Sequence, residues 1–341
     1  MSSQLVAAML KEYGALTREA LFAYMPASDP RLPLYDLCAE YPRRGGRSMR
    51  PSLCLATARA FGRPLRDALG TAVSIEMMHN AMLIHDDIED ESERRRGLPA
   101  LHVTEGVPIA INVGDTLSML SMRPLIDNQA RLGTHLALQL LEATARMARE
   151  SAEGQALELQ WRRDNPLDVT QEDYLAMVLK KTCWLATIHP RHAGALIGTG
   201  GKVDPEPLFR FGYLLGAAFQ IQDDLLNLQG DASQYGKELS GDLCEGKRTL
   251  MLIRLFERAN QAERERLRCA FAKSRAERTA DEVRWIREAM DRYDCIEYAR
   301  RVAHGLAGAA QHEFSLAFSA LPDSRDKRFI GALPAWVIQR N

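Results

Sequence analysis

Apolar residues recur at three- and four-residue spacing along most of the chain, which is the period of an amphipathic helix. Strong helix formers fill these windows, and alternating β-branched residues are scarce. The pattern predicts helices over residues 3–24, 51–62, 66–86, 107–125, 132–152, 171–182, 205–226, 247–259, 261–274, 278–293 and 295–320. Because no strand–helix alternation, GxGxxG motif or Walker A loop occurs, we expect one all-α domain over residues 1–341.

The composition is that of an ordinary globular protein. The net charge of −1 over 341 residues gives no field that favours nucleic acid, so no nucleic-acid partner is expected. Six cysteines without CxxC spacing favour reduced, buried thiols and a cytoplasmic location. Charged residues interrupt the N-terminal apolar run, and no stretch reaches ~18 apolar residues, so neither a signal peptide nor a transmembrane segment is expected.

An acidic cluster closes the predicted helix 66–86. Asp86 and Asp90 are four residues apart and share a helix face, with Asp87 beside them. Three carboxylates this close repel one another unless a cation neutralises them, and Mg²⁺ prefers carboxylate and phosphate oxygens. A solvated acidic helix end is the alternative, but the apolar residues 82–84 directly precede the cluster and disfavour it.

A second acidic pair repeats this arrangement. Asp223 and Asp224 follow the apolar run 209–219, and Asn227 stands where a third acid would complete the pattern. Two apolar helices that each end in paired acids predict a deep apolar cavity with a metal site at its opening.

Basic segments accompany both clusters, at residues 45–51, 94–97, 180–182 and 246–248 and at Lys237. Glycines in the first segment let the backbone approach a phosphate, and Arg and Lys are phosphate donors. A single run of basic residues usually forms a solvated face. The distribution of these basic segments beside acidic clusters, in a nearly neutral chain, favours diphosphate binding.

These residues resemble the trans-isoprenyl diphosphate (polyprenyl) synthases. Residues 79–90 with Arg95-Arg96-Gly97 are similar to the first aspartate-rich motif of that family, and residues 219–224 are similar to the second. Further landmarks are Gly154-Gln155, Lys181-Thr182, Gly241-Asp242 and residues 245–247. Residues 154–164 are most similar to the geranylgeranyl diphosphate synthase branch.

The resemblance implies antiparallel helices around a central cavity, a homodimer, and about three Mg²⁺ ions per active site. It implies that Asp86, Asp90 and Asp223 bind the metal, with Asp87 and Asp224 in support. The allylic diphosphate would be held by Arg95, Lys181 and Lys237, and Lys247 would also bind substrate. Isopentenyl diphosphate would be held by Arg47, Arg50, His79 and Arg96, and the developing allylic cation would be faced by Thr182 and Gln220.

The implied reaction is ionisation of the allylic diphosphate, condensation with isopentenyl diphosphate and loss of a proton. Departures from the family pattern are Arg47 in place of Lys, Glu158 in place of Asp, and Asn227 in place of an acid. Structural roles compete with some of these assignments: His79 also suits a hydrogen-bonded core position, and Thr182 and Gln220 also suit helix packing.

The residues before the first cluster bear on product length. At ~1.5 Å rise per residue, Met82 lies about 6 Å below Asp86 and Met78 about 12 Å below. Ala81 is small, and Ser118 and Met119 on the following helix are also permissive. We therefore predict a geranylgeranyl (C20) product, with C15 and C25 products as alternatives.

Two other functions remain open from the sequence. A terpene cyclase also uses an aspartate-rich helix, but it needs no isopentenyl site and its second metal motif is normally an Asn/Ser/Glu pattern. A non-catalytic partner subunit typically loses one aspartate cluster, whereas both are present here.

Overall fold

The computed structural model describes residues 2–30, 34–229 and 240–340. Its helices and strands, in chain order, are α1 Ser2–Phe22, α2 Asp36–Cys38, α3 Glu40–Arg43, α4 Met49–Ala60, α5 Leu65–Glu89, β1 Arg94–Arg95, β2 Leu98–Pro99, α6 Leu101–Glu105, α7 Val107–Leu120, α8 Met122–Leu132, α9 Thr134–Asp164, α10 Gln171–Val178, η2 Leu179–Ile188, α11 His189–Thr199, α12 Pro205–Gln229, α14 Gly241–Glu245, α15 Leu250–Arg258, α16 Gln261–Phe271, α17 Ala280–Arg292, α18 Cys295–Ala317 and α19 Arg325–Ile338.

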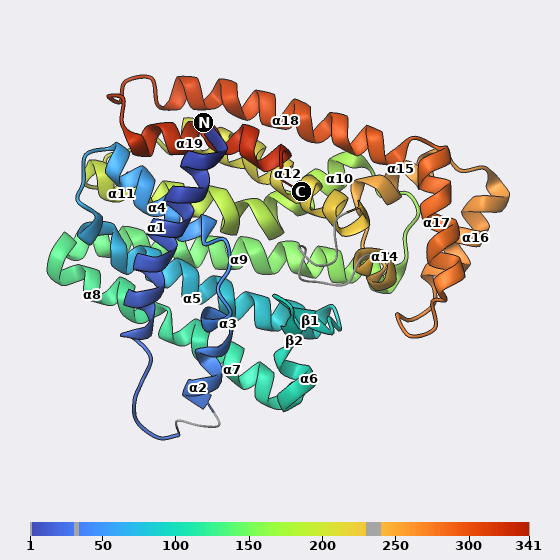
Figure 1. Ribbon diagram of the computed structural model, residues 1–341, viewed down its shortest axis with the longest axis horizontal. Coiled ribbons are helices and arrows are strands. Elements are labelled where there is room, and N and C mark those ends of the chain that lie inside the picture. The colour runs from blue at the N-terminus through green and yellow to red at the C-terminus, as the bar shows by residue number, and fades with distance from the viewer. Residues whose placement is uncertain (1, 31–33, 230–239, 341) are drawn as a thin grey trace.

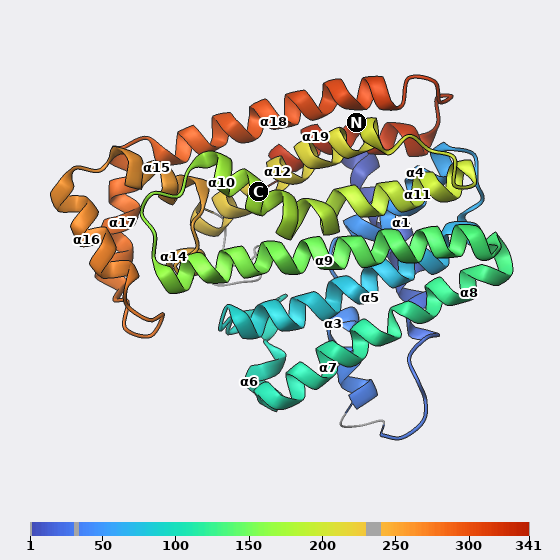
Figure 2. The same ribbon diagram turned by 180° about the vertical axis from the view of Figure 1, so that it is seen from behind.

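Long helices lie side by side and dominate the molecule (Figures 1 and 2). The helix α5 packs against α4, α7 and α8, while α12 packs against η2 and α18. The helix α9 joins these two halves, because it contacts both α8 and η2. The short strands β1 and β2 form an antiparallel pair just after α5. The predicted all-α fold is confirmed.

Three groups of buried apolar side chains fill the space between the helices. One lies among α4, α11, α12 and α19 and includes Phe211, Phe318 and Phe329. A second surrounds η2, α15, α17 and α18. The third lies between α1, α5 and α7 and includes Leu21 and Leu117. Burial of this apolar surface supplies the main driving force for bringing the helices together.

Two helical segments extend beyond the predicted boundaries. The helix α9 continues to Asp164 rather than ending at residue 152. Gly154 does not end the helix but lies where α9 touches η2. A β-carbon at Gly154 would collide with the backbone of Lys181, so the glycine permits the closest approach of the two elements. Likewise, α10 runs directly into η2, a π-helix of the kind that frequently occurs at functional sites.

The helices α11 and α19 were not predicted. In α11 almost every side chain is buried, including His189 and Arg191, so no polar face alternates with an apolar one. Burial lowers the pKa of His189 to about 3, and its Nε2 lies 3.3 Å from Thr144 Oγ1.

All six cysteines are free. Four of them are buried, whereas Cys244 is partly exposed and Cys269 is exposed. In the part of the chain that the structure describes, no helix combines the length and the apolar character needed to cross a bilayer.

We expect Gly154→Ala to destabilise the fold, because the added methyl group has to push α9 away from Lys181. Overpacking of this kind costs about 1–3 kcal/mol. Thermal unfolding would measure this loss of stability. The matched control is Gly305→Ala on α18, where no atom lies within 4 Å of the added carbon. That control should raise stability by about 0.5–1 kcal/mol.

The buried His189 predicts a pH-dependent loss of stability. Its pKa is lower in the folded chain than in the unfolded chain, so between about pH 6.5 and 3 the unfolded state binds more protons. The stability contributed by the neutral imidazole is therefore present above about pH 6.5 and is lost as the pH falls. In urea unfolding between pH 7 and 4, His189→Gln should show a shallower decline than the parent. Parallel declines would contradict the assignment.

Candidate active site

A single cavity of about 1020 Å³ collects most of the residues that the sequence singled out. Of these, the lining includes Arg47, Arg50, Met78, His79, Met82, Asp86, Arg95, Arg96, Ser118, Met119, Lys181, Thr182, Gln220, Asp223, Asp224 and Lys247. The lining does not include Asp87, Asp90 or Ala81, and Lys237 lies outside the described residues. Helices α4, α5, α7, α9, η2 and α12 all contribute to the walls.

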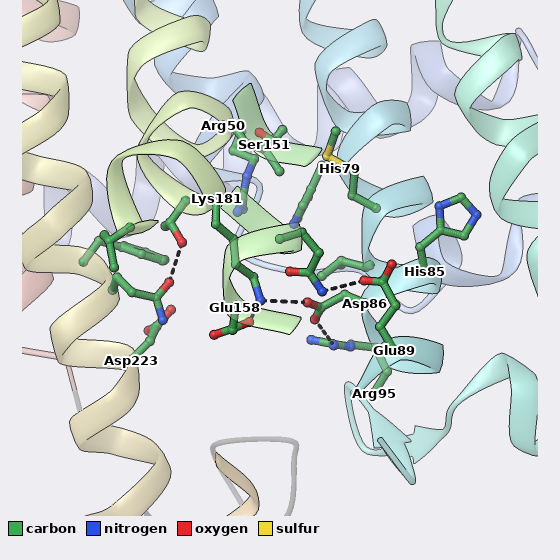
Figure 3. A pocket seen from close by; sticks show the side chains of 18 of the residues that line it. Arg50, His79, His85, Asp86, Glu89, Arg95, Ser151, Glu158, Lys181 and Asp223 are labelled. Atoms are coloured by element: carbon green, nitrogen blue, oxygen red, sulfur yellow. Dashed lines mark hydrogen bonds and ion pairs between the residues drawn. The ribbon is translucent and has the colours of Figure 1, made fainter. Parts of the chain in front are cut away.

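In the last turn of α5, Asp86 presents its carboxylate to the cavity. Its Oδ1 lies 3.4 Å from Lys181 Nζ, and its Oδ2 lies 3.3 Å from Arg95 Nη2 (Figure 3). Lys181 also pairs with Glu158 on α9. The neighbouring Lys180 points elsewhere and pairs with Glu150 at 2.9 Å, so only the second lysine of the pair enters the site.

The side chain of Asp87 is fully buried and is held by hydrogen bonds from neighbouring side chains. Its two oxygens accept hydrogen bonds from Arg95, at 2.8 and 2.9 Å from Nε, and Oδ2 also accepts from the Tyr41 hydroxyl at 2.7 Å. Tyr41 in turn accepts a hydrogen bond from the Leu101 backbone nitrogen at 3.2 Å. Burial, with the negative charge of Asp87, raises the pKa of Tyr41. Asp87 therefore positions Arg95 beside Asp86.

The carboxylate of Asp90 is also fully buried. Arg162 Nη1 lies 2.8 Å from its Oδ1, and Lys247 Nζ lies 2.7 Å from its Oδ2. Lys247 additionally contacts Glu245 at 2.8 Å and Asp242 at 3.6 Å. A metal ion at Asp90 would have to compete with these two cations.

The second cluster occupies the opposite side of the cavity, where Asp223 projects from α12 (Figure 3). Its Oδ1 pairs with Arg340 Nη2 at 2.8 Å. The guanidinium of Arg340 also lies over the Phe219 ring at 4.1 Å. Nothing in the local sequence around Arg340, near the end of the chain, signalled this contact.

The neighbouring Asp224 is buried and accepts two hydrogen bonds, from Tyr174 Oη at 2.8 Å and from Gln220 Nε2 at 2.7 Å. Burial and the charge of Asp242 raise the pKa of Asp224 well above its usual range. The buried Asn227, in the place of a third acid, accepts a hydrogen bond from the Asp242 backbone nitrogen at 3.1 Å. Asn227 therefore holds the start of α14, which carries Asp242.

Basic side chains line another part of the cavity wall. Arg96 Nη1 donates to Asn80 Oδ1 at 3.2 Å and to the Tyr41 carbonyl at 2.6 Å. Burial and the nearby Arg50 lower the pKa of His79 to about 4, so His79 is neutral at pH 7, and its Nδ1 lies 3.7 Å from Glu76 Oε2. Burial also lowers the pKa of Arg50 to about 10, although Glu76 opposes this effect. Arg50 Nε is buried and has no hydrogen-bond partner among the described residues, so an anion at this wall would supply the missing acceptor.

The inner part of the cavity is apolar. Met78 and Met82 line it, together with Met122, Met177 and Leu185. Ala81 is fully buried in the group of side chains between α1, α5 and α7. Adjacent helical residues point about 100° apart, so the neighbour of Met82 faces away from the cavity. The expected role of Ala81 in product length therefore has no support from its position.

The positions of the acidic side chains determine how a metal ion could bind in the cavity. Within the described ranges, no three His, Cys, Asp or Glu side chains gather closely enough to hold a metal ion by themselves. Carboxylates instead face the cavity from two walls, at Asp86 and Asp223, and cationic side chains surround them. Such a set fits a hard divalent cation that takes one or two carboxylates and completes its coordination with substrate phosphates.

Solved structures resemble the whole chain. The geranylgeranyl pyrophosphate synthetase of Pyrococcus horikoshii superposes with a TM-score of 0.86 and 31% identity, covering 100% of both chains. A geranylgeranyl pyrophosphate synthase from Corynebacterium glutamicum, complexed with isoprenyl diphosphate and magnesium, gives a TM-score of 0.84 at 25% identity. The match covers 97% of this chain and 99% of that one.

Curated relatives agree with the structural likeness. A short chain isoprenyl diphosphate synthase of Methanothermobacter thermautotrophicus is 38% identical over 76% of this chain and 77% of the relative. A geranylgeranyl pyrophosphate synthase of Geoglobus acetivorans is 31% identical over 99% of this chain and 100% of the relative. The family model described as polyprenyl synthetase matches residues 33–290. The chain therefore belongs to the polyprenyl synthetase family, as its two aspartate-rich segments predicted.

Proposed function

We propose that this prenyl diphosphate synthase is a Mg²⁺-dependent enzyme that condenses an allylic diphosphate with isopentenyl diphosphate to give geranylgeranyl diphosphate. The observation that carries the proposal is the cavity itself. Carboxylates and cations from separate helices face the cavity from two walls, and a methionine-lined apolar space continues from Asp86 along α5. A diphosphate with an isoprenoid tail has the same division into a charged head and an apolar chain.

The two diphosphates are assigned to different walls. Arg95, Lys181 and Lys247 surround the carboxylates and would hold the allylic diphosphate, together with Mg²⁺ at Asp86 and Asp223. Lys237 stays a prediction for the same group. Arg47, Arg50, His79 and Arg96 would hold isopentenyl diphosphate, and the unpartnered Nε of Arg50 supports that assignment. Asp90 remains a predicted metal ligand that would first have to lose its two cationic partners.

The chain's own residues would promote ionisation by stabilising the diphosphate as it leaves. Cations fixed in a partly buried site stabilise developing negative charge at little reorganisation cost. Bound Mg²⁺ would supply further Lewis-acid stabilisation to the same oxygens. The apolar lining excludes water from the carbocation, and Thr182 and Gln220 present oxygen atoms on the cavity wall. The departing diphosphate is our proposed acceptor of the final proton.

The methionine-lined space supports a C20 product. Met78 and Met82 lie one turn apart on α5, below Asp86, and methionine side chains adapt to the shape of a ligand. Ser118 and Met119 of α7 border the same cavity and leave it open on that side.

We also propose that residues 1–341 form one domain that acts as a cytoplasmic homodimer. Exposed apolar side chains occur on the consecutive helices α6, α7 and α8, at Val103, Val107, Ile109, Ile111, Met119 and Ile126. Exposed apolar surface is typical of an association surface.

We expect Asp86→Ala to lower kcat with farnesyl and isopentenyl diphosphates by about 10²–10³-fold or more, because the leaving group loses a metal-binding carboxylate. The circular dichroism spectrum should stay helical. The matched control is Asp281→Ala on α17, where an exposed carboxylate pairs with Arg284 at 3.0 Å. That control should keep full turnover. Retained activity in Asp86→Ala would remove the first cluster from the mechanism.

Product chromatography tests the proposed chain length. The parent should form C20 product from dimethylallyl, geranyl and farnesyl diphosphates. Met82→Phe should shorten the product toward C15, because a ring would fill the cavity one turn below Asp86. Met82→Leu, which conserves volume, is the control and should keep the C20 product. A sole C15 product from the parent would refute the length assignment, and a cyclised hydrocarbon would favour the terpene cyclase.

A further inference from the structure

A chain of hydrogen bonds runs along one part of the cavity wall. It begins at Tyr174 on α10, whose hydroxyl donates to Asp224 Oδ2 at 2.8 Å. Gln220 Nε2 donates to the other oxygen of Asp224 at 2.7 Å. Thr182 Oγ1 donates to Gln220 Oε1 at 2.7 Å. The four side chains therefore connect α10, α12 and η2, and all four belong to the cavity lining.

The direction of these bonds follows from the chemistry of the groups. Asp224 Oδ1 is an acceptor, so the amide of Gln220 must turn its nitrogen toward it and its oxygen toward Thr182. Thr182 then uses its only proton on Gln220, and its remaining capacity is that of an acceptor. The wall consequently presents oxygen lone pairs to the cavity.

Tyr174 is placed to hold this arrangement. Its side chain is buried with 1% exposure, in the same group of apolar side chains as Val178 and Leu225. A capping box between Thr170 and Asp173 fixes the start of α10, directly before Tyr174. Because α10 continues into η2, the Tyr174–Asp224 and Thr182–Gln220 bonds tie the same two segments together at two points.

The two acids of the second cluster thus differ in what they can do. The side chain of Asp223 is 32% exposed and faces the cavity, whereas Asp224 is 5% exposed and has donors on both oxygens. We infer that Tyr174 is a positioning residue for the prenyl transfer reaction. Acting through Asp224, it orients the Gln220 amide and the Thr182 hydroxyl so that their lone pairs face the carbocation. The inference rests on the proposed function, because it concerns the same cavity and the same cation.

Tyr174→Phe removes the hydroxyl alone and tests the inference. We expect kcat to fall about 5- to 50-fold, while KM for both diphosphates changes by less than about twofold, because the orientation matters in the transition state. Calorimetric binding of a non-ionising allylic diphosphate analogue with Mg²⁺ should match the parent. A large loss of that binding would mean that Tyr174 supports the metal site instead, and the inference would be wrong.

The matched control is Tyr13→Phe. Tyr13 is also buried, and its hydroxyl donates to Asp326 Oδ1 at 2.6 Å, between α1 and α19 and outside the cavity lining. Both variants should lower the melting temperature, but the control should keep the parent kcat. Kinetics are measured at least 20 °C below the melting temperature of each variant. Equal kcat values for the two variants would overturn the inference.

A double-mutant cycle separates positioning from general loss of structure. Thr182→Val should lower kcat in the parent, but it should lower kcat much less in the Tyr174→Phe background, because the orientation is already lost there. Additive effects would show that Tyr174 acts independently of Thr182 and would refute the inference. Failure of the proposed function is a separate result, because the parent itself would then form no prenyl product.

Discussion

Buried negative charge in two acidic clusters, on opposite sides of the cavity, is the constraint on which the rest of the structure depends. Five carboxylates, at Asp86, Asp87, Asp90, Asp223 and Asp224, lie in the two clusters, and three of them are buried. Uncompensated buried charge is costly, so each needs cations or hydrogen-bond donors. Those partners come from η2, α9, α10, α12, the β1–β2 segment and the C-terminal end of the chain. Satisfying the charges therefore requires that helices far apart in sequence converge here.

The two clusters solve this requirement in the same way. In each Asp-Asp pair the first carboxylate is partly exposed and contacts cations, at Asp86 and Asp223. The second carboxylate, at Asp87 and Asp224, is buried and accepts a hydrogen bond from a tyrosine hydroxyl. Adjacent helical residues point about 100° apart, so one acid of such a pair is more exposed and the other is more buried. The repeated acid is thus an anchor for the wall as much as a source of charge.

Local periodicity was enough to predict the helices that carry one apolar face, and the acidic pairs were enough to predict where the charged end of the cavity lies. Periodicity did not predict α11, which is buried on nearly all sides. It also did not predict the role of Gly154, which depends on contact with Lys181. Tyr41, Tyr174 and Arg340 were also missed, because each is an ordinary residue type that acts across 46 or more positions in the chain. The anchoring of Asp90 by Arg162 and Lys247 could not be derived from spacing either.

One face of α5 links the charged part of the site to the apolar part. Met78, Met82 and Asp86 follow one another at four-residue intervals, so the apolar side chains of the cavity and the carboxylate that faces its charged part share one rigid element. A change in packing around the methionines therefore acts on the position of Asp86 as well as on the depth of the cavity. On the other side, η2 and α9 meet at Gly154, and Lys181 reaches Asp86 from there. In the proposed function, product length and leaving-group stabilisation would consequently be coupled through the packing of these three helical segments.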